Sequence, residues 1–212
     1  MPASTLTAAA ALRWIEDSAA VLDGKKDYLT ELDSAIGDGD HGVNMARGFQ
    51  AVKAKLSSVP PNDIGALFKL VAMTLISTTG GASGPLYGTF FLKTAVTISG
   101  KAELTPSELG AAFQAGLAGV LALGKAAVGD KTMVDVLTPA IHVLTSSANG
   151  ELLSAELARA VEAARKGAES TVPLVARKGR ASYLGERSTG HLDPGAASSL
   201  LLFETLAKTV GD

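Results

Sequence analysis

Cysteine is absent from the 212-residue sequence, which excludes disulfide bonds and thiolate metal sites. A metal ion would therefore need oxygen or imidazole ligands. Aromatic residues make up only 5% of the chain although 47% of it is hydrophobic, so the core must consist mainly of Ala, Leu and Val. This composition favours closely packed helices, because small side chains let neighbouring backbones approach one another.

The chain also lacks the features of exported, membrane and nucleic-acid-binding proteins. Its net charge is −2 and its Lys and Arg residues are scattered, so no basic surface for nucleic acid or lipid is expected. The N-terminus has no basic start, and Arg13, Glu16 and Asp17 interrupt its apolar run, which argues against a signal peptide. No run of about 18 apolar residues is present to cross a bilayer. We therefore expect a cytoplasmic protein without membrane or nucleic-acid partners.

Helical patterns dominate the sequence. The clearest one begins at Thr105, Pro106 and Glu108, a capping box with proline in the first turn. Apolar residues follow at helical spacing, namely Leu109, Ala112, Phe113, Gly116, Leu117, Val120, Leu121 and Gly124. Further helices are predicted at residues 4–23, 25–34, 41–57, 62–78, 85–98, 131–148, 151–172 and 194–210. In the last of these, Asp193 is expected to cap the helix and Pro194 to stand at its first position.

Three local features qualify this pattern. Pro139 should kink or split the helix at 131–148, residues 94–98 are a weak candidate for a strand, and residues 57–63 are predicted to form a turn. No linker rich in Gly, Ser and Pro divides the chain. The sequence therefore predicts one all-α domain over residues 1–212, with about eight helices.

An acidic segment lies between Glu31 and Met45 and contains Asp33, Asp38 and Asp40, separated and followed by glycines. Three carboxylates this close repel one another unless a cation lies among them, and hard oxygen ligands suit Mg²⁺ or Ca²⁺. The spacing does not match a calcium-binding loop. Because a helix-capping turn uses the same residue types, spacing alone leaves a metal site and a capping turn as equal alternatives.

A glycine-rich segment follows, in which Gly80, Gly81, Ser83 and Gly84 lead into a helix through Pro85. Backbone N–H groups at a helix start can hold a phosphate when no side chain obstructs them. The lysine of a Walker A loop is missing. A tight helix crossing at the glycines is the alternative interpretation.

Two further loops carry charged residues. In the first, Asp130 can cap the next helix, and Met133 with Gly124 could form an apolar slot for a flat ring, although core packing is the commoner role of methionine. The second has four cations within residues 177–187, with glycines among them and His191 after them. It could lie over bound phosphates as a lid, or it could be a solvated basic loop.

Together the four segments provide a cation site, a phosphate cradle, an apolar slot and a basic lid, which are the parts that a magnesium–nucleotide diphosphate complex requires. The motifs GDGDHGVNM, GGASGPLYGTFF, GDKTMVDVL and GRASYLGERSTGHLDPGA occur in this order. From about residue 10 to its end, the chain resembles the nucleotide-binding L subunits of dihydroxyacetone kinases. The same family includes the C-terminal domain of single-chain ATP-dependent kinases. Its fold is an eight-helix antiparallel barrel with the nucleotide site at one end.

The resemblance implies roles for individual residues. Asp33, Asp38 and Asp40 are implied to bind two Mg²⁺ ions that bridge to the nucleotide phosphates, and so to act in catalysis through the metal. The residues implied to bind ADP or ATP are His41, Gly42, Asn44, Ala82, Ser83, Gly124, Met133, Arg180, Asp193, Pro194 and Gly195.

The resemblance also implies partners. The chain has no room for the family's sugar-binding domain, so it is expected to dock on a separate K subunit that holds dihydroxyacetone. In the members that depend on the phosphotransferase system, ADP stays bound and is rephosphorylated by a phosphohistidine on an M subunit. The alternatives are an ATP-dependent version, a kinase subunit for another small ketose, and a non-catalytic regulator that senses nucleotide. Homodimer formation also stays open.

Overall fold

The computed structural model describes residues 3–58, 62–147 and 151–211. Within these residues the chain forms nine α-helices, two 3₁₀ segments and one pair of two-residue antiparallel strands, so the all-α prediction is confirmed. The elements are β1 (Leu6–Thr7), α1 (Ala8–Gly24), α2 (Lys26–Ile36), α3 (His41–Lys53), η1 (Leu56–Ser58), α4 (Ile64–Thr78), α5 (Ser83–Thr97), β2 (Glu103–Leu104), α6 (Pro106–Gly124), α7 (Val134–Thr145), α8 (Leu153–Ser170), η2 (Arg180–Ser188) and α9 (Pro194–Gly211).

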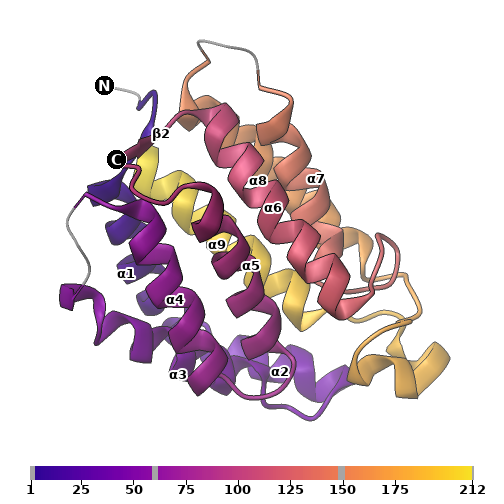
Figure 1. Cartoon of the computed structure of the whole chain (residues 1–212). Coiled ribbons are helices and arrows are strands. Elements are labelled where there is room, and N and C mark those ends of the chain that lie inside the picture. The colour runs from indigo at the N-terminus through magenta and orange to yellow at the C-terminus, as the bar shows by residue number, and fades with distance from the viewer. Residues whose placement is uncertain (1–2, 59–61, 148–150, 212) are drawn as a thin grey trace.

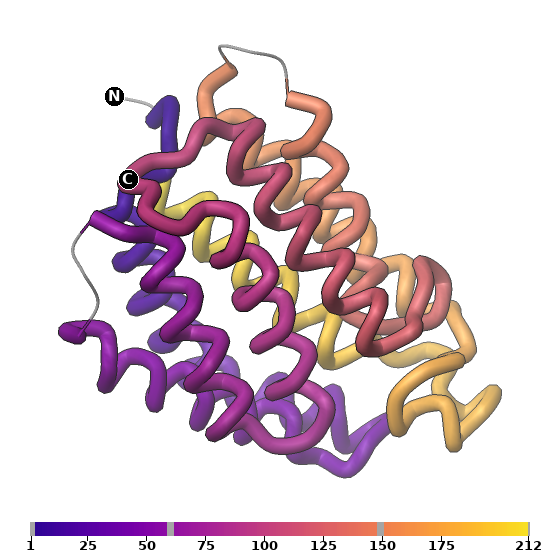
Figure 2. The backbone as a smooth tube through the Cα atoms, in the orientation of Figure 1, coloured from indigo at the N-terminus to yellow at the C-terminus, as the bar shows by residue number. Residues whose placement is uncertain are grey.

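Eight of the described helices form a closed ring. Helices α1, α3, α4, α5, α6, α7, α8 and α9 each pack on the next, and α9 packs on α1. Helices α4, α5 and α6 run side by side in alternating directions (Figure 2). Helix α2 lies across one end of the ring, at the lower edge of Figure 1, where it contacts α3, α9 and η2. The expected eight-helix barrel is therefore present, with a ninth helix at the end that carries the acidic segment.

The few aromatic residues of the chain are concentrated inside this ring. Trp14 of α1 lies with its ring centroid 5.7 Å from that of Phe68, 5.9 Å from Phe91 and 6.1 Å from Phe113. Its indole N–H donates to the carbonyl of Leu202 at 3.0 Å. Aromatic side chains bury large apolar areas, so this cluster joins α1 to α4, α5 and α6. The indole hydrogen bond ties α1 to α9 as well.

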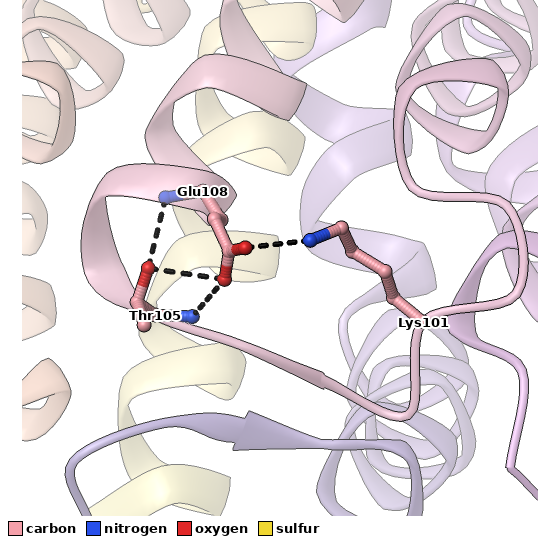
Figure 3. Close-up of polar contacts among 3 residues, drawn as sticks. All are labelled: Lys101, Thr105 and Glu108. Carbon is pink, nitrogen blue, oxygen red and sulfur yellow. Dashed lines mark hydrogen bonds and ion pairs between the residues drawn. The ribbon is translucent and has the colours of Figure 1, made fainter.

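The predicted capping box forms at the start of α6 (Figure 3). Thr105 Oγ1 accepts a hydrogen bond from the backbone N–H of Glu108 at 3.3 Å, and Glu108 Oε2 accepts one from the backbone N–H of Thr105 at 2.9 Å. Lys101 Nζ also donates to Glu108 Oε1 at 2.6 Å. The hydrogen bond from Lys101, followed by those from Thr105, lowers the pKa of Glu108 to about 2.

Two local predictions are wrong and a third is narrowed. Residues 94–98 are not a strand, because residues up to Thr97 belong to α5. Pro139 lies inside α7 and does not split it, so of the two predicted effects only a kink stays a prediction; the carbonyl of Asp135, which a proline cannot bond, lies close against Gly167 of α8. The first helix begins at Ala8 rather than at residue 4, because Leu6 and Thr7 pair with β2. Residue 148 and part of the turn predicted at 57–63 lie outside the described residues.

Helix α6 also differs from expectation. By length and composition it is apolar enough to cross a bilayer, which the sequence analysis did not predict, and 39% of this stretch is buried. Its buried residues, including Leu109, Phe113 and Val120, belong to the hydrophobic core. The apolar character of α6 is thus used in packing against α5 and α7 within the ring.

Candidate functional site

The acidic segment folds back on the last turn of α2. Asp33 is buried there, and its Oδ2 accepts hydrogen bonds from the backbone N–H of Asp40 at 2.8 Å and of His41 at 3.0 Å. These bonds bring Asp38 and Asp40 back beside Asp33, although α2 ends at Ile36. The position of Asp33 near the end of a short helix is therefore as predicted.

The three aspartates form a cluster that fits a hard divalent cation. One carboxylate oxygen from each lies within 4.8 Å of the others, and Asp38 and Asp40 are exposed. Asp33 Oδ1 lies where a Cβ of Gly37 would be, so the cluster depends on a glycine at that position. Carboxylate oxygens are the ligands that Mg²⁺ and Ca²⁺ prefer, and the donor set agrees with such an ion.

His41 joins three helices behind this cluster. Its Nε2 lies 2.8 Å from Ser198 Oγ of α9, and its Nδ1 lies 3.0 Å from Ser83 Oγ of α5. Burial is the largest influence on the pKa of His41 and lowers it, while the carboxylates of Asp33 and Asp40 oppose this effect. The two serine contacts occupy both ring nitrogens, so His41 fixes the start of α3 relative to α5 and α9.

The glycine-rich segment forms the opposite wall. Gly81 has a φ of +64°, and Gly84 passes the carbonyl of Thr79 so closely that a Cβ would overlap it. Helix α5 begins at Ser83 directly after Ala82, and no side chain of the described residues caps its first turn. The first backbone N–H groups of α5 are thus available to an anion, as the phosphate-cradle interpretation requires.

Asn44 lies beside the glycine-rich segment, whereas Gly42 lies against α2. Asn44 Oδ1 accepts a hydrogen bond from Arg47 Nη2 at 2.5 Å, and its Nδ2 faces Gly81. Gly42 is buried against the backbone of α2, where a Cβ would overlap the carbonyl of Lys26. The structure therefore places Gly42 beneath α2 rather than along the cleft, where close helix packing explains the glycine.

A solvent-open cleft of about 780 Å³ lies between these walls. Most of the predicted site residues line it, namely Asp33, Asp38, Asp40, His41, Ala82, Ser83, Met133, Arg180, Asp193, Pro194 and Gly195. A second, adjoining hollow of about 700 Å³ is more apolar and is lined by Leu86, Val120, Gly124 and Met133, among others. The predicted apolar slot is thus present beside the acidic cluster, and Met133 borders both.

Residues 172–192, here called the lid, cover one side of the cleft and include η2. In Figure 1 this orange segment lies next to α2. Ala176 and Ala181 of the lid form a small apolar cluster with Ile36 of α2. Arg180 Nε lies 3.1 Å from Asp38 Oδ2, so the lid places a cation directly on the acidic cluster.

The lid ends at the turn that starts α9. Asp193 is buried, and its Oδ2 accepts a hydrogen bond from the backbone N–H of Ala196 at 2.7 Å, which confirms the predicted cap with Pro194 at the first helical position. Burial raises the pKa of Asp193 to about 7, although the bond from Ala196 and the charge of Lys131 lower it. Asp193 therefore caps α9 and has a pKa that burial raises to near neutral pH.

The DAK2 domain family model matches residues 35–208. The chain belongs to this family.

Similar proteins extend the comparison beyond the DAK2 domain itself. The chain is 46% identical to the "PEP-dependent dihydroxyacetone kinase, ADP-binding subunit DhaL" of Escherichia coli (strain K12), over 92% of this chain and 94% of that protein. It is 44% identical to the "PTS-dependent dihydroxyacetone kinase, ADP-binding subunit DhaL" of Lactococcus lactis, over 97% and 99% of the two chains. The dihydroxyacetone kinase of C. freundii in complex with AMP-PNP and Mg²⁺ has a similar structure, with a TM-score of 0.73 and 29% identity over 98% of this chain. This chain covers only 34% of that kinase.

Several residues of this DAK2 domain that border the cleft were not predicted. Tyr87 Oη donates to the carbonyl of Gly195 at 3.1 Å and lies 2.7 Å from Ser198 Oγ, and burial raises the pKa of Tyr87 to about 12. Lys131 is buried beneath the lid. Tyr87 lies in the quoted glycine-rich motif and Lys131 in GDKTM, but neither a lone tyrosine nor a lone lysine signals which distant element it will contact.

Asp130, a candidate cap for the helix that follows it, does not cap α7. Its Oδ2 accepts a hydrogen bond from the backbone N–H of Ala127 at 2.8 Å. Asp135 instead closes the turn, because its carboxylate accepts from the backbone N–H groups of Gly129 and Thr132 at 2.5 and 2.7 Å. The turn is thus closed by Asp135, a residue of the first turn of α7, and not by a residue that precedes the helix.

Proposed function

We propose that this chain is the ADP-binding subunit of a dihydroxyacetone kinase. It holds a magnesium–ADP complex and relays a phosphoryl group from a phosphohistidine on an M subunit to dihydroxyacetone on a K subunit. The names of the E. coli and L. lactis relatives, which match over nearly their whole length, support this proposal. We also propose a cytoplasmic location for this subunit.

The observation that carries the proposal is the composition of the cleft. Three carboxylates, an uncapped helix start and the Arg180 guanidinium all border one space, and an apolar slot adjoins it. A nucleotide needs these groups in this arrangement, because its ring is apolar and flat while its phosphates are anionic and bind cations. A structural helix bundle would gain nothing from three adjacent carboxylates.

Each wall of the cleft has a separate task in the proposed reaction. Asp33, Asp38 and Asp40 would hold two Mg²⁺ ions, whose charge stabilises a phosphoryl group in transit. The first turn of α5 would orient the phosphates with backbone N–H groups. Arg180 would add positive charge from the lid side, and Met133 with Gly124 would border the adenine ring.

The exposed position of Asp38 and Asp40 fits transfer between separate proteins. A phosphoryl group that arrives from one partner and leaves to another must be reached from outside, and both carboxylates lie at the solvent-open side of the cleft. An ATP-dependent subunit would use the same walls and exchange its nucleotide after each turnover. A subunit for another small ketose would differ in the K partner, because we assign no sugar-binding group to this chain.

Native mass spectrometry of the purified protein separates the two nucleotide-dependent versions. We expect one ADP and two Mg²⁺ per chain after gel filtration, and the same spectra report whether the chain is a monomer or a homodimer. A relay assay with K and M subunits should then proceed with phosphoenolpyruvate and the phosphotransferase enzymes. If the protein carries no nucleotide and ATP alone supports turnover, the ATP-dependent version is correct.

Asp38→Ala tests the catalytic role against a regulatory one. Asp38 is exposed, and its one ion pair among the described residues is with Arg180, so the variant should fold normally and lose magnesium-dependent ADP binding and phosphoryl transfer. Asp27→Ala is the control, because Asp27 is an exposed aspartate in the first turn of α2, at the other end of that helix from the cluster. A regulator would retain partner binding and function in Asp38→Ala.

A further inference from the structure

Lys131 occupies an unusual position for a lysine. It lies in the turn before α7 with a φ of +64°, a conformation that non-glycine residues rarely adopt, and its side chain is 0% exposed. Its ammonium group donates to the carbonyls of Thr171 at 2.6 Å and His191 at 2.5 Å, and more weakly to that of Val172 at 3.4 Å. An ammonium group has three N–H donors, so these three carbonyls use all of them.

The three carbonyls belong to the two ends of the lid. Thr171 and Val172 stand where α8 passes into the lid, and His191 stands where the lid passes into α9. The same two ends share the hydrogen bond from Gly190 N–H to the Val172 carbonyl at 2.8 Å, and that from Asp193 N–H to Thr171 Oγ1 at 3.1 Å. Lys131 therefore lies at the point where a loop of about twenty residues closes on itself.

The electrostatic setting of Lys131 favours carbonyls over an ordinary ion pair. No carboxylate oxygen of the described residues lies within 4.0 Å of its Nζ. Burial is the largest influence on the pKa of Lys131 and lowers it, while Asp193 and Asp135 raise it from a longer distance. A buried ammonium group is costly unless it is hydrogen-bonded, and these carbonyls meet that need. Without Lys131, the carbonyl of buried Thr171 would lose its ammonium donor, and so would the carbonyl of His191 at the other end of the lid.

The turn that carries Lys131 also touches the nucleotide side of the cleft. Met133, two residues later, borders both the cleft and the apolar slot. On the other side of Lys131, the carbonyl of Asp130 accepts a hydrogen bond from the backbone N–H of Arg177 in the lid at 3.1 Å. Residues 130–133 of the turn therefore connect the lid, through Asp130, with the apolar slot, through Met133.

We propose that Lys131 is a positioning residue that fastens the two ends of the lid and thereby sets how long the nucleotide stays bound. The proposal rests on the proposed function in so far as the retained ligand is magnesium–ADP. Lys131 touches no reacting group; it acts through the lid, which carries Arg180 to Asp38. A subunit that keeps ADP as a cofactor needs slow release, and closing both ends of the lid with one buried group supplies a physical means for it.

Lys131→Met tests the proposal, with Lys125→Met as the matched control. Methionine keeps the length and removes the three donors. Lys125 also has a positive φ, at 50°, but is exposed and caps α6 outside the lid. Two rates are measured in each variant: tryptic cleavage within the lid at Arg177, Lys178, Arg180 and Arg187 in the nucleotide-free protein, and release of a fluorescent ADP analogue in the presence of Mg²⁺.

We expect Lys131→Met to raise both rates by about tenfold or more, because the carbonyls at both ends of the lid lose the ammonium group that joins them, and Lys125→Met to leave both unchanged. A merely structural lysine would lower the melting temperature but leave lid cleavage and ADP release at wild-type rates, and this result would overturn the proposal. If the wild-type protein binds no ADP, the proposed function fails, while the cleavage of the nucleotide-free lid still decides the role of Lys131.

A measurement on the wild-type protein decides the question if Lys131→Met does not fold. Amine-labelling reagents should modify Lys131 only when the base of the lid opens, whereas Lys125 is accessible at all times. After equilibrium dialysis has established that ADP is bound, magnesium–ADP should slow the labelling of Lys131 by about tenfold or more and leave that of Lys125 unchanged. Equal labelling of Lys131 with and without bound ADP would refute the proposed role.

Discussion

The ring of helices and the end that carries the cleft are stabilised by different kinds of contact. Inside the ring, Trp14 and the phenylalanines pack against one another, and apolar burial dominates. At the cleft, the acidic segment, the glycine-rich segment and the lid are joined by single hydrogen bonds, such as those to Asp33 Oδ2 and from Lys131 Nζ. Apolar packing tolerates many sequences of the right volume, whereas these bonds require particular side chains. Stability and function can therefore be changed separately in most places.

The largest effect is expected at Asp33, which belongs to the metal cluster and also holds the acidic segment against α2. Asp33→Ala should lower phosphoryl transfer by about a thousandfold, because a metal supplies several kcal/mol of transition-state stabilisation. It should also destabilise the fold, because the N–H groups of Asp40 and His41 lose their acceptor, at about 1–3 kcal/mol. Activity assays and urea unfolding measure the two losses. A variant that loses activity at wild-type stability would show that Asp33 serves the metal alone, as Asp38 is expected to do.

In the ring, Phe68→Ala should cost stability without affecting the cleft. Phe68 is fully buried and packs edge-on to Trp14, so the change should lower the free energy of unfolding by about 3–5 kcal/mol. The affinity of the folded protein for ADP should not change. Tyr183→Ala is the control, because this side chain is 88% exposed on the lid and its removal should change stability by less than about 0.5 kcal/mol. Equal losses in the two variants would contradict the separation of the regions.

The same difference explains how much the sequence could predict. The ring followed from local signals: the apolar spacing after Pro106, the capping box of Thr105 and Glu108, and Asp193 before Pro194 all formed as predicted. The errors at residues 94–98 and at the start of α1 occurred where tertiary contacts override local preference. The β1 strand, for example, exists because it meets β2, about a hundred residues away.

The cleft was predicted less evenly. The residues within GDGDHGVNM and GGASGPLYGTFF do converge, because Asp33 folds the acidic segment back and Ser83 meets His41. Lys131 escaped notice, because its acceptors lie about forty and sixty residues further along the chain. Gly42 was assigned to nucleotide binding, but it lies in the packing of α3 on α2. A motif gives the members of a site, and the chain path decides which of them face the ligand.

Gly42→Ala gives a smaller effect that links the two regions. A Cβ at this position would overlap the carbonyl of Lys26 and approach the backbone N of Thr30, so α2 must move away from α3. We expect a loss of about 1–3 kcal/mol from this overpacking, together with weaker magnesium–ADP binding, because α2 carries Asp33. Gly24→Ala is the control, since a Cβ there meets nothing within 4 Å. Destabilisation with unchanged ADP affinity would show that the metal cluster does not depend on the position of α2.

The smallest effect concerns the capping box of Thr105 and Glu108 at the start of α6 (Figure 3). The pKa of Glu108 is about 2 in the folded protein, below its ordinary value of 4.5, so its contribution to stability is present above pH 4.5 and is lost as the pH falls through 2. Because the Lys101–Glu108 pair is partly exposed, we expect Glu108→Gln to cost only about 1 kcal/mol at about pH 7. Urea unfolding at about pH 7 and about pH 2 should show this difference shrinking towards zero in acid. A difference that stays constant with pH would mean that the hydrogen bonds between Glu108 and Thr105 stabilise the start of α6 without the charge of Glu108. The stability of this helix start would then not depend on pH.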